Sequence, residues 1–193
     1  MKLVAVIGHA VSPGALVMTR LKSFVFAQSA LAAAAYGSPH ITMPPTPVFR
    51  LSDVPFLGAG RKEKLDLYFP SGDFRSNRPA VVFIHGGGFV VGSKDAAVHN
   101  GSAFARSGVV CVAINYRMGI DGFLPVPGVP TNLGLRDILF ALAWVQRNVA
   151  AFGGDPANVT VFGESAGAMA IGASVSQDEK VQPTAFQLQT KRP

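Results

Sequence analysis

Residues 159–167 read Val-Thr-Val-Phe-Gly-Glu-Ser-Ala-Gly and form the most informative stretch of the sequence. Its first four residues form a short apolar run that is typical of a buried strand. Gly163 and Gly167 lie two residues on either side of Ser165, where larger side chains would clash in a sharp turn, and an apolar run of small residues follows from Ala166. A Gly-x-Ser-x-Gly pattern between a strand and a helix predicts a nucleophile elbow, in which the turn exposes the serine hydroxyl.

The residues before this stretch predict further strands and helices. Leu65–Phe69 alternates apolar and polar residues, which predicts a half-buried strand. Ala80–Ile84 and Val109–Ile114 are continuous apolar runs of the kind found in fully buried strands. Leu133–Val149 has apolar residues at helical spacing, and Lys94–Arg106 predicts a helix or a mixed segment. Strands that alternate with helices predict an α/β fold with a mostly parallel sheet.

A second motif, His85-Gly86-Gly87-Gly88, directly follows the predicted strand Ala80–Ile84. A tetrahedral intermediate of acyl transfer needs backbone N–H groups about 3 Å from its oxyanion. A run of glycines lets the backbone approach that closely, because glycine has no side chain and adopts unusual backbone angles. The glycine run and the backbone N–H of Ala166 therefore form a candidate oxyanion hole.

Five spaced segments of the chain, taken in order, carry a family resemblance. They are Phe83–Phe89, Asn115–Gly119 with Gly122–Leu124, Asn132–Asp137, Trp144–Asn148, and Phe152–Pro156 leading into Gly163–Gly167. On these segments the chain resembles the N-terminal part of the type B carboxylesterases, of the α/β-hydrolase superfamily. The resemblance covers about half of the chain directly.

The resemblance implies an α/β-hydrolase fold and a serine esterase that works through an acyl-serine intermediate. It implies that Ser165 is the nucleophile and that Gly87, Gly88 and Ala166 form the oxyanion hole, while Glu164 tunes the site electrostatically. The substrate class it implies is a small-molecule carboxylic ester, with no metal or cofactor. Two alternatives stay open: a non-catalytic binding or decoy product of the same family, and an esterase of the hormone-sensitive-lipase type.

Composition excludes several other classes of protein. The formal net charge is +6, but residues 1–52 carry four basic side chains and no acidic one. A nucleic-acid-binding domain concentrates its charge on the folded part, so we expect no nucleic-acid partner. The apolar stretches Leu3–Ile7 and Leu31–Tyr36 are far shorter than the ~20 residues of a transmembrane helix. A single cysteine, Cys111, excludes an internal disulfide and a cysteine-based zinc cluster.

Three zones differ in composition. Residues 1–49 are free of acids and rich in Ala and Ser, residues 50–173 form the predicted α/β domain, and residues 174–193 are a polar tail. From Met18, a basic stretch, an apolar run and small residues near Ala33–Ala35 predict a signal peptide and hence a secreted protein. An organellar transit peptide and a poorly ordered arm remain alternatives for residues 1–49. Val4–Gly8 resembles the start of a dinucleotide-binding strand, but no Gly-x-Gly-x-x-Gly follows it.

The part of the chain after Ser165 lacks an expected residue type. In the α/β hydrolases the triad runs Ser, then Asp or Glu, then His along the chain. All histidines of this chain precede Ser165; they are His9, His40, His85 and His99. Without a base the serine hydroxyl stays protonated and weakly nucleophilic, so we expect weak or absent esterase activity.

The family resemblance stops after Ala173, which predicts an α/β-hydrolase domain truncated after the nucleophile elbow. Because strand Val159–Phe162 is central in this superfamily, such a chain is expected to leave one edge of that strand unpaired. An unpaired central strand predicts aggregation.

Overall fold

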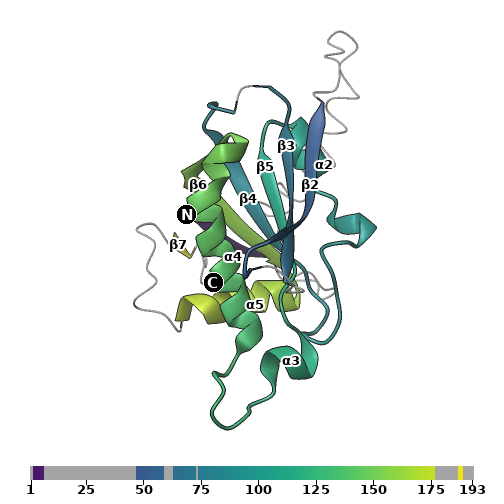
Figure 1. Cartoon of the computed structure of the whole chain (residues 1–193), viewed down its shortest axis with the longest axis vertical. Helices are drawn as coiled ribbons and strands as arrows, with labels where there is room; N and C mark the ends of the chain where they lie inside the picture. The colour runs from purple at the N-terminus through teal and green to yellow at the C-terminus, as the bar shows by residue number, and fades with distance from the viewer. Residues whose placement is uncertain (1, 7–46, 59–62, 73, 177–186, 189–193) are drawn as a thin grey trace, which may run out of the picture.

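The computed structural model describes residues 2–6, 47–58, 63–72, 74–176 and 187–188. Its centre is a sheet with the strand order β2-β3-β5-β4-β6-β1-β7 (Figure 1). The strands are β1 (Lys2–Val6), β2 (Val48–Pro55), β3 (Lys64–Pro70), β4 (Arg78–Ile84), β5 (Val110–Ile114), β6 (Gly154–Glu164) and β7 (Gln187–Leu188). β3 runs antiparallel to both β2 and β5, and the neighbours from β5 to β7 run parallel to one another.

Helices cover the sheet on two faces. α4 (Leu133–Asn148) and α5 (Ala166–Ser176) pack against β6, whereas α2 (Ser102–Arg106) packs on β2, β3 and β5. Figure 1 shows α4 running along the sheet, with α5 across its lower part and α3 (Gly119–Phe123) below. Two short 3-10 turns, η1 (Ala97–His99) and η2 (Val149–Phe152), complete the described elements. No helix among the described residues is long and apolar enough to cross a membrane.

The core follows from the alternation of side chains along the strands. Leu65, Val82, Val112 and Val161 face α4 and α5 in the larger apolar cluster. Their neighbours on the opposite face, such as Cys111, form a smaller cluster beneath α2. Because both faces of the central strands are buried, these strands are continuous apolar runs in the sequence.

The predicted strands and the long helix are confirmed, with shifts of one or two residues at most ends, although β6 begins at Gly154, five residues before the predicted Val159. The clearest difference concerns β3, for which alternation predicted a half-buried strand. β3 is buried on both faces, and its polar residue, Asp66, has no exposed surface. An ammonium group and a guanidinium group, described below, pair with this carboxylate and make its burial tolerable.

The expectation of an unpaired edge on β6 is wrong. β1 lies beside β6 in parallel, with Lys2 opposite Thr160 and Val6 opposite Glu164. β1 falls inside residues 1–49, which the composition assigned to a leader or a poorly ordered arm. Residues 7–46, which include the predicted cleavage site, lie outside the described residues.

Regular structure also crosses both compositional boundaries. β2 begins at Val48, before the boundary at residue 50, and it pairs with β3. α5 continues to Ser176, three residues beyond Ala173, where the sequence analysis expected the domain to end. A helix can continue there because each added residue gains one hydrogen bond and neither Gly nor Pro occurs between Ala173 and Ser176.

Candidate active site

Ser165 lies at the turn between β6 and α5. Its φ is 50°, a left-handed value that a non-glycine residue adopts only at a cost of ~1–2 kcal/mol. The turn is tight, because a Cβ added to Gly163 would lie 2.6 Å from the carbonyl carbon of Gly167. Ser165 itself is exposed, while Ala166, which follows it, is 2% exposed. This is the geometry that the Gly-x-Ser-x-Gly pattern predicts.

The glycine-rich loop packs directly against this turn. A Cβ on Gly86 would lie 2.8 Å from the backbone oxygen of Glu164 and 3.1 Å from the Cβ of Ser165. From the other side, a Cβ on Gly167 would overlap the carbonyl oxygen of Ile84, the last residue of β4. The fold therefore brings together two motifs that are far apart in the sequence, since Gly87 of the first lies 76 residues before Gly163 of the second.

The loop after β4 has an unusual backbone. Gly87, Gly88 and Phe89 have φ values of 117°, 64° and 62°, so three successive residues lie in the left-handed half of the map. The carbonyl oxygen of Gly87 accepts hydrogen bonds from Val90 N at 3.1 Å and from Val91 N at 3.0 Å. These bonds close the loop, so that its N–H groups do not have to be ordered when a ligand arrives.

His85 supports this loop from beneath. The residue is fully buried, and its ring lies against the Tyr116 ring with centroids 4.7 Å apart. Nδ1 of His85 lies 2.8 Å from the carbonyl oxygen of Gly86. Because a carbonyl only accepts, Nδ1 carries the proton, and burial, the largest effect, lowers the pKa of His85 and keeps the ring neutral. Tyr116 in turn donates its hydroxyl hydrogen to the carbonyl oxygen of His85 at 2.9 Å.

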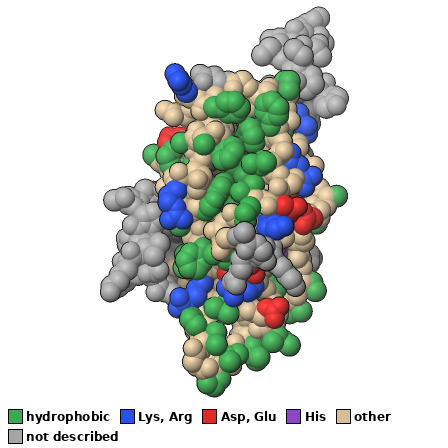
Figure 2. Space-filling view, viewed as in Figure 1, with side chains coloured by type: hydrophobic (Ala, Val, Ile, Leu, Met, Phe, Trp, Pro, Cys, Tyr) green, Lys and Arg blue, Asp and Glu red, His purple; other side chains and the backbone are tan. Residues whose placement is uncertain are grey.

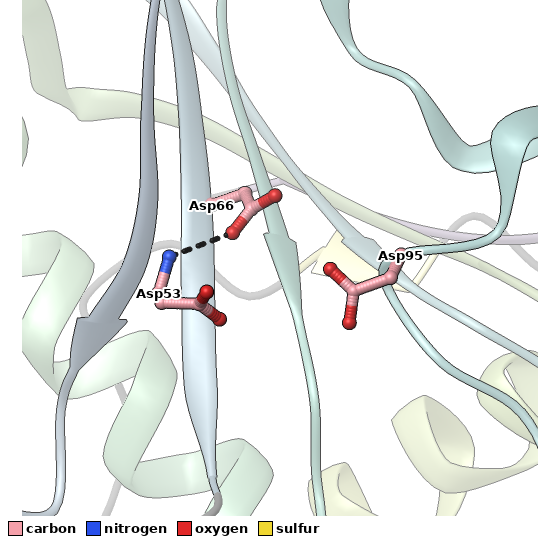
Figure 3. Close-up of side chains that lie close together, drawn as sticks. All are labelled: Asp53, Asp66 and Asp95. Carbon is pink, nitrogen blue, oxygen red and sulfur yellow. Dashed lines mark hydrogen bonds between the residues drawn. The ribbon is translucent and has the colours of Figure 1, made fainter.

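A cluster of charged groups anchors the far end of the same loop. The ammonium of Lys94 lies 2.8 Å from Asp66, 3.0 Å from Asp53 and 2.7 Å from Asp95. Arg50 adds a second cation 2.7 Å from Asp66. Figure 3 shows the three carboxylates, which come from β2, β3 and the segment after β4. Their oxygens lie within 4.8 Å of one another, a spacing that also suits a metal ion, but the Lys94 ammonium already lies within ion-pair distance of all three.

The pKa values of this cluster reflect the balance of burial and pairing. Burial by itself would raise the pKa of Asp66, but hydrogen bonds from Lys94, from the Asp53 backbone N–H and from Arg50 together hold it below its ordinary value. Burial by itself would lower the pKa of Lys94, and its three carboxylate partners raise it well above the ordinary range instead. Asp66 and Lys94 are therefore both charged at neutral pH.

A second ion pair fixes the segment after β5. Arg117 donates to Asp137 of α4 through two nitrogens, at 2.8 and 2.6 Å, and its backbone N–H adds a third bond at 3.0 Å. Asn115 accepts a hydrogen bond from the backbone N–H of Lys94 at 2.7 Å. The side chains of Asn115 and Arg117 thus stabilise loop structure.

An apolar rim lies beside the glycine-rich loop. The N–H of Gly119, which begins α3, donates to the carbonyl oxygen of Phe89 at 2.6 Å, so α3 starts next to the loop. Figure 2 shows hydrophobic side chains over α3 and the loop before α4, at the lower end of the molecule. The exposed residues there are Ile120, Leu124, Val126 and Val129.

Both histidines among the described residues form hydrogen bonds to backbone carbonyl groups. His85 supports the glycine-rich loop, and Nδ1 of His99 bonds to the carbonyl oxygen of Ser93 at 2.7 Å. His9 and His40 lie outside the described residues. Glu164, the last residue of β6, is exposed and pairs in register with Val6. Sequence reasoning did not identify the Lys94 cluster, and its one signal was an aspartate at position 66 inside an apolar strand.

A family model described as the carboxylesterase family matches residues 64–187, which is more than half of the chain. The chain belongs to the carboxylesterase family. This match favours the carboxylesterases over the hormone-sensitive-lipase type that the motifs alone left open. The carboxylesterase match covers the glycine-rich loop, the Ser165 turn and the strands and helices around them. β1 and β2 lie before the matched residues.

Named carboxylesterase-like relatives agree with the match. The chain is 47% identical over 116 residues to a fumonisin B1 esterase of Sphingopyxis macrogoltabida, covering 56% of this chain and 22% of that protein. It is 50% identical over 99 residues to a cholinesterase of Mus musculus, covering 49% of this chain and 16% of that protein. The chain therefore spans less than a quarter of the length of these curated relatives.

A solved PNB esterase gives the fold. The two structures align with a TM-score of 0.55 and 44% sequence identity, over 57% of this chain and 25% of the esterase. A thermophilic PNB esterase aligns equally well, at 43% identity. The predicted α/β-hydrolase fold is confirmed on this basis.

Proposed function

We propose that this chain carries the nucleophile half of a carboxylic ester hydrolase. Ser165 attacks the carbonyl carbon of the ester, and the N–H groups of Gly87, Gly88 and Ala166 bind the oxyanion that forms. The observation that supports this most strongly is the packing of Gly86 against Ser165, because it brings the glycine-rich loop beside a strained, exposed hydroxyl. The acyl group then passes from the alcohol oxygen of the substrate to the serine oxygen.

The proton of Ser165 is the weak point of this reaction. Attack requires a base to take that proton and an acid to give it to the leaving alcohol. The two described histidines, His85 and His99, bond to backbone carbonyl groups, so within the described residues neither is placed as that base. The substrate is a small-molecule carboxylic ester, and the chemistry needs no cofactor.

Labelling with a fluorophosphonate probe tests this proposal without requiring turnover. We expect the full chain to be labelled once, with Ser165→Ala removing the label by at least ~100-fold, since the probe reports the nucleophile directly. Ser107→Ala is the matched control. Ser107 is an exposed serine at the C-terminal end of α2, and its replacement should leave the labelling unchanged. Mass spectrometry of the peptide that carries the label locates it.

The competing function is a non-catalytic binding or decoy product. The bonding of both described histidines to backbone carbonyl groups favours it, whereas Ser165 and the closed glycine-rich loop favour the enzyme. Equal labelling of the parent chain and Ser165→Ala, or no labelling of a folded chain, would support the decoy and reject the esterase.

We also propose export as the cellular route, on the strength of the basic stretch and apolar run after Met18. Cleavage near Ala33–Ala35 would remove β1 from the mature chain. N-terminal sequencing of the exported protein decides this point, because a start at or after residue 34 indicates cleavage and a start at Met1 rejects it.

A further inference from the structure

The nucleophile strand has a neighbour from the opposite end of the chain. β1 runs parallel to β6 over five consecutive register pairs, from Lys2 opposite Thr160 to Val6 opposite Glu164. On its outer side, β1 pairs with the two-residue β7, its only neighbour there among the described residues. Forty residues separate Val6 from Pro47, the next described residue, so no short connection forces β1 into this position.

The edge that β1 covers is one that the sheet needs to protect. Val159 and Val161 of β6 have no exposed surface, and both belong to the main apolar core. An uncovered edge beside such residues presents unpaired N–H and C=O groups, which are a template for another strand. The sequence Lys-Leu-Val-Ala-Val of β1 has the apolar and β-branched residues that suit a buried parallel position.

We propose that the outer edge of β6, from Thr160 to Glu164, is a strand-acceptor site that binds an extended apolar peptide parallel to β6. In the whole chain Lys2–Val6 fills this site in cis. Removal of those residues opens it to a peptide of the same sequence supplied in trans. The site does not depend on whether Ser165 is catalytic, since it is formed by backbone groups of β6.

The register gives the site a direct connection to the turn. The bound strand ends opposite Glu164, one residue before Ser165. A strand held on this edge therefore fixes the last residues of β6 from one side while β4 fixes them from the other, with Ile84 opposite Gly163. An open edge leaves the turn supported on one side only.

Paired cysteines test the position and the register of the bound strand. Lys2→Cys with Thr160→Cys places two cysteines opposite each other, at a spacing of about 4.8 Å that a disulfide can bridge. Val4→Cys with Thr160→Cys is the control, because a slip of two residues moves the Cα atoms to about 8 Å apart, beyond the reach of a disulfide. Cys111 is buried, and burial raises its pKa to about 12, so the native thiol does not compete.

We expect mild oxidation to convert most of the first variant to a cross-linked monomer on a non-reducing gel, at least ~10-fold more than the control. Equal cross-linking of the two pairs would contradict the register. A cross-linked dimer in place of the monomer would contradict filling in cis, because the strand would then come from a second copy.

Deletion of residues 2–6 tests the acceptor edge itself. We expect amide exchange within residues 159–164 to accelerate at least ~10-fold at alternate positions, those whose N–H groups point toward β1. Addition of the peptide Lys-Leu-Val-Ala-Val at millimolar concentration is expected to restore the protection, and Lys-Leu-Pro-Ala-Val is not, since proline removes a ladder donor. Unchanged exchange on deletion, or equal protection by both peptides, rejects the strand-acceptor site.

If the deleted chain aggregates before exchange is measured, the same peptides are added during refolding. Recovery of monomer with the first peptide alone supports the site, and recovery with neither or with both rejects it.

Discussion

Replacing Gly87 with alanine is expected to disrupt the glycine-rich loop and to destabilise the chain by about 3 kcal/mol. The added Cβ would overlap the carbonyl oxygen of Val91, and the φ of 117° is one that an L-residue rarely adopts. The backbone N–H of Val91 also donates to the carbonyl oxygen of Gly87 and closes the loop. Val91 therefore cannot move away from the added Cβ without breaking that hydrogen bond. Urea unfolding measures the change in stability, and the rate of fluorophosphonate labelling reports the site.

Gly88→Ala is the matched control in the same loop. Gly88 has a φ of 64°, within the left-handed region that other residues tolerate, and a Cβ there would meet no atom within 4 Å. We expect a cost of about 1 kcal/mol, and labelling close to that of the parent chain, because the backbone N–H is retained. Equal stability losses for the two variants would show that the described loop conformation does not limit the site.

Replacing Lys94 with methionine is expected to destabilise the chain by about 3–5 kcal/mol. The side chain of Lys94 is 1% exposed and that of Asp66 is fully buried, so the substitution leaves a buried carboxylate with Arg50 as its remaining cation. Because Lys94 anchors the end of the glycine-rich loop, labelling of Ser165 should slow as well. The free energy of unfolding in urea at pH 7 measures the effect.

A second substitution separates charge from shape. Lys94→Met combined with Asp66→Leu removes both buried charges, and we expect it to recover most of the lost stability, as apolar replacements of buried ion pairs do. Asp95→Asn is a milder control, because Asp95 is 56% exposed and should cost under about 1 kcal/mol. A double variant as unstable as Lys94→Met would show that the ammonium acts through packing rather than by compensating Asp66.

The pH dependence follows from the direction of the Asp66 shift. The pKa of Asp66 is lower in the folded chain than in the unfolded chain, so its contribution is present above the unfolded value of about 4 and is lost as the pH falls through the folded pKa. In Lys94→Met the burial effect prevails, and the folded pKa is expected to rise above the unfolded one. The penalty of that substitution should therefore be smaller at pH 4 than at pH 7, which unfolding at the two pH values tests.

Periodicity alone predicted the elements whose environment is simple. Ala80–Ile84 is a continuous apolar run because both faces of β4 are covered, and Leu133–Val149 shows a helical stripe because α4 has one buried face. The elbow was predicted equally well, since Gly163 and Gly167 are required by contacts within the turn itself. Geometry that depends on contacts between residues close in the chain leaves a local sequence pattern, so a single sequence is enough to predict it.

Features that depend on distant residues escaped prediction. Asp66 appeared as the polar side of a half-buried strand, because nothing beside it in the sequence shows that Lys94 would meet it in three dimensions. Lys2–Val6 appeared as part of a leader, because its partner β6 begins some 150 residues later. The loop's support by His85 and Tyr116 likewise joins residues 31 apart.

The pairing of β1 with β6 has a consequence for how the chain is made. Val6 leaves the ribosome 158 residues ahead of Glu164, its register partner. At 5–20 residues per second, about 8–30 s of synthesis separate the two. During that interval the apolar residues of β1 have no partner strand, so a chaperone or a neighbouring nascent chain can bind them. β1 is therefore made long before its partner strand, and the sheet can close on this side only after β6 has been synthesised.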